Sequence, residues 1–273
     1  MGWKMYAVLC NLSYVFEIIV PLISHIVWGT SLNLPISNYH FLSDEIRDRY
    51  FYFWFTYQAF GMYGHMSYNI NIDSFIAGLI LCIILRVNIL KSNLQNLDSK
   101  FTSVQKQLPF KKFSEDSKLK QHLRNYDIIL RLSSKVQKII SVPAFVQFGV
   151  TTAIICVALC GLLTPSASNF HLFLVTYILS MTSRIFVPAW LGAKLTQQSQ
   201  ALVFAAYSSE WIERSENFKQ NLRLFMTRAC NPIIFYGIKI CPVSLTTFTS
   251  IMKTAYSLFT LVRHIQNRQN GVI

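Results

Sequence analysis

The sequence predicts an all-α integral membrane bundle with helical extensions into the cytosol, and three observations support this fold class. Apolar residues make up 52% of the 273 residues and charged residues only 14%, whereas soluble domains carry about 25% charged residues. Long apolar stretches recur, each near or above the roughly 20 residues that a spanning helix needs. The formal net charge is +13, with Lys and Arg gathered between these stretches. This pattern excludes a disordered chain and favours a lipid bilayer over nucleic acid as the partner.

We expect a single membrane domain over residues 1–273, with five transmembrane helices. The candidate spans lie at about 6–28, 50–85, 139–163, 170–192 and 233–262. The first span shows no small-residue cleavage site, so we expect it to be retained rather than removed as a signal peptide. The last is rich in Ser and Thr. Their hydroxyls either bond to neighbouring helices or line an aqueous path.

The second apolar stretch remains compatible with a helix to about residue 97, so at 1.5 Å per residue it is roughly 70 Å long and must project from the bilayer. Its far end predicts a coiled-coil seam with spacings of four and three: Leu90, Leu94, Leu97, Phe101, Val104 and Leu108. We expect Pro109 to end this helix and Ser114 to cap the next. The next helix repeats the seam at Leu119, Leu123, Tyr126 and Leu130.

The Lys and Arg residues predict the orientation of the chain. Twelve lie in segment 86–138 and five in segment 193–232, which together with Lys4 places eighteen on one side. The other side has four. Because the richer side is cytosolic, we expect a cytosolic N-terminus and, after five spans, an extracellular C-terminus in the cell membrane.

Charged residues within or beside apolar spans are candidates for function, because a charge in hydrocarbon costs a few kcal/mol and usually faces protein or water. An interface residue whose side chain reaches the headgroups is the alternative, and an Asp–Arg or Glu–Lys pair is possible. These residues are Glu17, Asp73, Arg184, Lys239 and Lys253. The six Cys and six His form no metal-binding pattern, and no catalytic motif is present. We therefore expect no enzyme activity, no cofactor and no metal site.

Two regions could form functional surfaces. Tyr57, Phe60, Gly61 and Gly64 could wall an apolar ligand pocket, although ordinary packing explains each of them equally well. The polar last span ends in Leu258, Leu261 and Val262, which could form a hydrophobic constriction that gates by dewetting.

Two stretches in the C-terminal third carry a recognisable pattern: residues 195–211 read LTQQSQALVFAAYSSEW, and residues 222–263 end in CPVSLTTFTSIMKTAYSLFTLVR. These stretches resemble the last loop and last span of insect odorant receptors. The matching positions in the last span are Pro242, Ser244, Leu245, Phe248, Lys253, Tyr256, Ser257, Phe259 and Arg263.

The resemblance implies a ligand-gated, non-selective cation channel with seven spans, of which the five here correspond to the third through the seventh. It implies a heterotetramer with an odorant co-receptor, joined through cytosolic anchor segments at about 86–138 and 193–232. It also implies a small volatile apolar ligand in the outer half of the bundle and a pore lined by the last span.

On this basis we expect two sets of site residues. The ligand pocket set is Tyr14, Tyr57, Phe60, Gly61, Gly64, Phe148 and Tyr177. The pore set is Ser257, Leu258, Leu261 and Val262. The alternatives are a gustatory-type receptor, a non-functional partial receptor chain, and a G-protein-coupled receptor or transporter.

Overall fold

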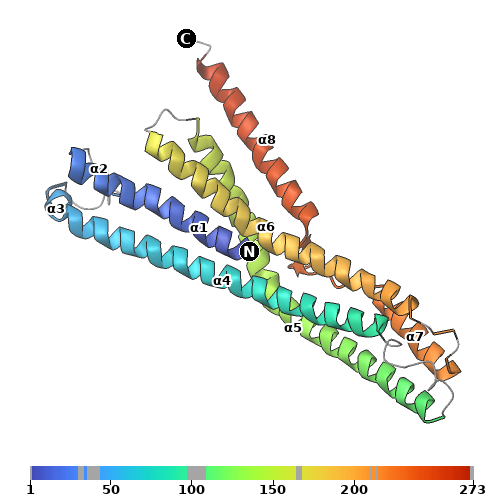
Figure 1. Ribbon diagram of the computed structural model, residues 1–273. Coiled ribbons are helices and arrows are strands. Elements are labelled where there is room, and N and C mark those ends of the chain that lie inside the picture. The colour runs from blue at the N-terminus through green and yellow to red at the C-terminus, as the bar shows by residue number, and fades with distance from the viewer. Residues whose placement is uncertain are drawn as a thin grey trace. The chain divides into compact units, whose positions relative to one another are not determined.

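The computed structural model describes residues 2–29, 34–35, 44–96, 109–163, 168–209, 211–212 and 214–270, most of them helical (Figure 1). The first helical run consists of α1 (Gly2–Tyr14), the π-helical segment η1 (Val15–Ile19) and α2 (Val20–Trp28). The other elements are α3 (Asp44–Arg49), α4 (Phe51–Gln95), α5 (Pro109–Gly161), α6 (Ser168–Tyr207), α7 (Glu216–Ala229), β1 (Tyr236–Gly237), β2 (Cys241–Pro242) and α8 (Leu245–Asn270). The predicted all-α fold class is confirmed.

Among the described residues, four helical stretches are long and apolar enough to cross a membrane, judged by length and composition. They are Lys4–Val27, Phe51–Gln95, Ser117–Gly161 and Phe170–Tyr207, and each contains most of one of the first four predicted spans. The last helix, α8, is not among them, because hydroxyl and basic residues interrupt its apolar face. The four stretches support a multi-pass membrane protein.

The chain divides into two compact units. Unit 1 comprises Met1–Phe75, Gln147–Val187 and Phe248–Ile273, and unit 2 comprises Ile76–Val146 and Pro188–Thr247. Because α4, α5 and α6 each contribute to both, the division cuts across helices rather than between successive stretches of sequence. Unit 2 contains both segments expected to lie outside the bilayer, 86–138 and 193–232.

The α4 part of unit 2 buries a seam with spacings of four and three residues. Its members are Ile76, Ile80, Ile83, Val87, Leu90 and Leu94, all less than 8% exposed. The seam predicted from Leu90 is therefore already present a full 14 residues earlier in the chain. Its continuation at Leu97, Phe101, Val104 and Leu108 lies outside the described residues. On α5, Leu119 and Tyr126 are buried, while Leu123 and Leu130 are partly exposed.

Two helix boundaries differ from the sequence-based expectation. Helix α5 begins at Pro109 rather than at Ser114, which lies inside the helix; the segment that Pro109 was expected to end lies outside the described residues. Proline fits the first turn because the amide that it lacks has no helical partner there. Helix α8 begins at Leu245 rather than near residue 233, because the preceding residues form the β1–β2 hairpin.

Helix α7 positions the segment that leads into this hairpin. Ser215 caps it by accepting a hydrogen bond from the Phe218 amide. Its buried side chains recur every three or four residues and give it one apolar face: Phe218, Leu222, Phe225 and Ala229. Phe225 meets Tyr126 of α5 edge to face, with the ring centroids 5.1 Å apart.

Candidate functional site

Unit 1 contains a buried polar network that joins four helices. Asp73 of α4 lies 2.8 Å from Nε of Arg184 on α6, measured to Oδ2, and their side chains are 10% and 18% exposed. The Tyr6 hydroxyl of α1 donates to Oδ2 of Asp73 at 3.0 Å. Gln147 of α5 donates to Oδ1 at 3.3 Å, and Arg184 donates through Nη2 to Asn69 at 2.9 Å. Of the pairings left open by the sequence, the structure thus selects Asp73 with Arg184.

This network compensates charges that would be costly if unpaired. An ionised side chain removed from water is tolerated only when an opposite charge and hydrogen bonds replace its hydration. The contact between Nε of Arg184 and Oδ2 of Asp73 is an ion pair. Its geometry is not that of an aligned hydrogen bond. The network links α1, α4, α5 and α6 to one another within unit 1.

The other charged candidates lie in different surroundings. Glu17 lies within η1 and is partly buried, and Lys253 is exposed on α8. Lys239 lies in the turn of the β1–β2 hairpin, with φ +60°. It is therefore a turn residue and not part of a helix.

The predicted ligand pocket residues do not form one cluster in the described structure. The Tyr14 hydroxyl donates to the Ala59 carbonyl at 3.2 Å, and its ring meets that of Tyr63 edge to face at 5.6 Å. Tyr57 and Phe60 are 64% and 78% exposed, on a different face of α4 from the one that packs on Tyr14. Gly61 and Gly64 lie on that exposed side, with no atom within 4 Å of an added Cβ.

The two remaining pocket candidates lie inside unit 1. Phe148 of α5 is 4% exposed. Tyr177 of α6 is partly buried and stacks on Phe173, with 5.5 Å between ring centroids. The assignment of these residues to a ligand pocket stays a prediction.

Most of the predicted pore residues are exposed on α8. Ser257, Leu258 and Leu261 are exposed, the two leucines at 45% and 55%, and Val262 is partly buried. The opposite side of α8 packs within unit 1 through Phe248, whose ring meets that of Phe186 at 5.4 Å. The helix therefore has one packed face and one uncovered face that carries the pore candidates.

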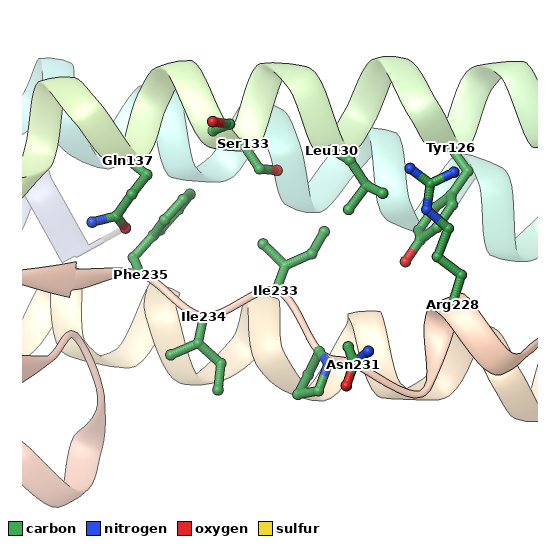
Figure 2. Close-up of a pocket in the computed structure, with 11 residues that line it drawn as sticks. Tyr126, Leu130, Ser133, Gln137, Arg228, Asn231, Ile233, Ile234 and Phe235 are labelled. Carbon is green, nitrogen blue, oxygen red and sulfur yellow. The ribbon is translucent and has the colours of Figure 1, made fainter. Parts of the chain in front are cut away.

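Unit 2 contains an open pocket between α5 and the segment that follows α7. Its volume is about 390 Å³, within the range of small-molecule sites. Leu130 from α5 and Ile233 from the facing segment point into it, and Figure 2 shows Tyr126 beside Arg228 at one end. Arg228 forms an ion pair with Asp127 at 2.6 Å.

The β1–β2 hairpin borders this pocket and was not anticipated from the sequence. Gln137 of α5 pairs with the backbone of Tyr236: its Nε2 donates to the carbonyl at 2.6 Å and its Oε1 accepts from the amide at 2.9 Å. The only sequence signals for the hairpin were Gly237 and Pro242. Over the described residues, no group of three or more His, Cys, Asp or Glu could hold a metal ion.

Comparison with known proteins places the chain in a family. The sequence profile of the family described as "7tm Odorant receptor" matches residues 3–256. Odorant receptor 2a of Drosophila melanogaster is 26% identical over 211 residues, which cover 76% of this chain and 53% of that protein. Odorant receptor 10 of Aedes albopictus is 28% identical over 146 residues, which cover 53% and 39%.

The fold also matches a solved receptor. The olfactory receptor OR5 of Machilis hrabei, solved in complex with eugenol, superposes with a TM-score of 0.72 at 18% identity, covering 97% of this chain and 65% of that one. A second structure of the same receptor gives a TM-score of 0.77. The chain spans about half the length of the curated relatives that it matches. With its fold and most of its sequence matched, the chain belongs to the 7tm odorant receptor family.

Proposed function

We propose that this chain is an odorant receptor subunit that forms an odorant-gated, non-selective cation channel with an odorant co-receptor, as a heterotetramer, and that it is not an enzyme. The observation that carries this proposal is the family match over residues 3–256. The polar composition of α8 supports it, in contrast to the four apolar helical stretches found among the described residues, because a helix with hydroxyls on an uncovered face suits the wall of an aqueous path.

The proposed ligand is a small, volatile, mainly apolar molecule. Eugenol, bound by the Machilis hrabei receptor, belongs to this chemical class. Tyr14, Phe148 and Tyr177 offer aromatic surface with one or two hydroxyls, which suits a ligand held by apolar contact and oriented by a hydrogen bond. Tyr57, Phe60, Gly61 and Gly64 leave a face of α4 uncovered, on which further wall elements could pack.

The proposed orientation places the N-terminus and the anchor segments at about 86–138 and 193–232 in the cytosol, and the C-terminus outside the cell. Eighteen Lys and Arg on one side against four on the other support this orientation. Epitope tags at the two ends check it: in intact cells, antibody should reach only the C-terminal tag. Labelling of an N-terminal tag without permeabilisation would favour the G-protein-coupled receptor alternative.

The proposed gate is the uncovered face of α8. Leu258 and Leu261 are exposed in the single chain, and subunits arranged around a symmetry axis would bring such side chains together. A ring of leucines excludes water until the helices separate. Odorant binding would favour the separated state if the ligand binds that state more tightly.

Co-expression with the co-receptor tests the proposal. The expected result is a current evoked by members of a broad odorant panel, carried by both Na⁺ and K⁺ and absent when either subunit is omitted. A second arm joins to this chain the N-terminal part of a relative such as Odorant receptor 2a. If only the joined protein conducts, these residues do not form a channel without the added N-terminal part, as the partial-receptor alternative predicts. If neither conducts while both reach the surface, the channel proposal fails.

A further inference from the structure

The strongest unexplained feature of the chain is the β1–β2 hairpin between α7 and α8. Tyr236 pairs with Pro242 and Gly237 with Cys241, and the Ile240 amide donates to the Gly237 carbonyl at 3.0 Å. The central residues of this turn, Ile238 and Lys239, have φ of +47° and +60°. Such values suit a hairpin turn but normally fall to Asn or Gly. For a β-branched isoleucine the conformation is strained and persists only where surrounding contacts impose it.

Contacts from α5 impose this conformation. The side-chain amide of Gln137 forms two hydrogen bonds with the backbone of Tyr236, as a neighbouring strand would. One turn further along α5, Ser141 accepts the Ile238 amide through its backbone carbonyl at 3.2 Å and its Oγ at 3.0 Å. A Cβ on Gly237 would lie 3.1 Å from the Phe145 amide nitrogen. Three successive positions on one face of α5 therefore hold the first strand and the turn.

Helix α6 holds the end of the hairpin. A Cβ on Gly192 would collide with the Val243 carbonyl oxygen, so the backbones of α6 and Val243 meet where only glycine fits. Val243 is 2% exposed, and its amide donates to the Phe235 carbonyl at 2.8 Å. The segment between α7 and α8 is thus held from α5 on one side and from α6 on the other.

The hairpin is joined directly to the first turn of α8. The Thr247 hydroxyl donates to the carbonyl of Pro242, in β2, at 2.6 Å. Ser244, at the N-terminus of the helix, accepts from the Thr247 amide at 3.4 Å. The first three residues of α8 belong to unit 2 and the rest to unit 1, so a displacement of the hairpin acts on a helix that continues into unit 1.

We propose that the hairpin is the clamp that sets the position of α8, and that Gln137, Ser141 and Gly192 are positioning residues for the gate. The three belong to unit 2, whereas the predicted pore and ligand residues belong to unit 1. They act through the Tyr236–Val243 backbone and the Thr247–Pro242 bond. This inference rests on the proposed function for its channel readout, but its structural readout is independent of it.

The structural test is hydrogen exchange on the full chain in lipid nanodiscs, without ligand. Gln137→Met removes both hydrogen bonds at nearly constant length. We expect about tenfold faster exchange at Tyr236 and Ile238, with faster exchange also in the first two turns of α8. The matched control is Gln121→Met, an exposed position on the same helix, which should leave both regions unchanged. Faster exchange of the hairpin with no change in α8 would overturn the proposal, since the hairpin would then be held without holding the helix.

The channel test uses Gly192→Ala, whose Cβ forces the Val243 carbonyl away, against Gly78→Ala, which meets no atom within 4 Å. Both are expressed with the co-receptor and compared at equal surface density. Gly192→Ala should change the ratio of ligand-free to odorant-evoked current several-fold, whereas Gly78→Ala should not. An unchanged ratio in Gly192→Ala, with a conducting unaltered chain, would refute the clamp. If the unaltered chain itself gives no current, the proposed function fails and hydrogen exchange alone decides about the clamp.

Discussion

Replacing Asp73 with Asn tests the network that joins α1, α4, α5 and α6. The substitution preserves the shape of the side chain but removes its charge, and so leaves the Arg184 guanidinium largely buried with Asn69 as its remaining hydrogen-bond partner. Removing one partner of a buried ion pair costs about 3–5 kcal/mol in soluble proteins. Both side chains here retain some exposure, at 10% and 18%, so we expect the lower end, about 3 kcal/mol.

The assay is thermal unfolding in detergent micelles, followed by intrinsic tryptophan fluorescence. A loss of about 3 kcal/mol corresponds to a melting temperature lower by about 6–12 °C for a chain of this size. The double variant Asp73→Asn with Arg184→Gln leaves no uncompensated charge, so it should be more stable than the sum of the single effects by about 1–3 kcal/mol. The control is Glu216→Gln, which breaks the Glu216–Lys219 pair, in which the glutamate side chain is 84% exposed, and should leave the melting temperature unchanged. Additive single effects, or an unchanged Asp73→Asn variant, would refute the reasoning.

Substitutions at three further positions have defined outcomes. Phe225→Ala removes the ring that packs on Tyr126 and should lower stability by about 3–5 kcal/mol, measured by denaturant unfolding in micelles; a loss below 1 kcal/mol would contradict the packing. Ser215→Ala removes the cap of α7 and should cost about 1 kcal/mol, whereas Ser215→Asp should retain most of it; equal losses would count against a capping role. Tyr14→Phe removes the hydrogen bond to the Ala59 carbonyl but keeps the aromatic contact. We expect a loss of about 1 kcal/mol in stability and an unchanged response to odorants that lack a polar group. A lost response to those odorants would place the hydroxyl in a different role.

The long helices of the fold were predictable from the sequence, because a membrane requires long apolar stretches that can be recognised locally. Apolar length predicted four long helical stretches that the described residues contain, and the spacing of Leu90 and Leu94 predicted a seam that the structure extends back to Ile76. These features depend on helix periodicity, which any stretch of sequence reveals without knowledge of its partners.

The hairpin and the polar network were not predictable in the same way. Ile238 and Lys239 give no turn signal, since the positive φ values are imposed by α5 through Gln137 and Ser141, which lie about 100 residues away. The sequence marked Asp73 and Arg184 as costly charges but could not pair them, because pairing depends on which helix faces meet. Tyr6 and Gln147 lie in apolar stretches of the sequence, where an isolated polar residue does not reveal which network it joins.

The pocket prediction is limited in the same way, because the sequence does not reveal which helix faces meet. Tyr57, Phe60, Gly61 and Gly64 share one face of α4, as helical spacing requires, while Tyr14 packs against another. Residue type indicated aromatic surface, but the sequence does not say which face of α4 meets α1.

The most direct measurement is cysteine accessibility along α8 in the co-expressed channel. Leu261→Cys is treated with a water-soluble, positively charged thiol reagent while odorant-evoked current is recorded. If α8 lines the conducting path, the reagent blocks the current of this variant and leaves the unaltered chain, with its six native cysteines, unaffected. If Leu261→Cys conducts normally and the reagent has no effect, while the exposed Cys is shown to be modified on the protein, then α8 does not line the pore.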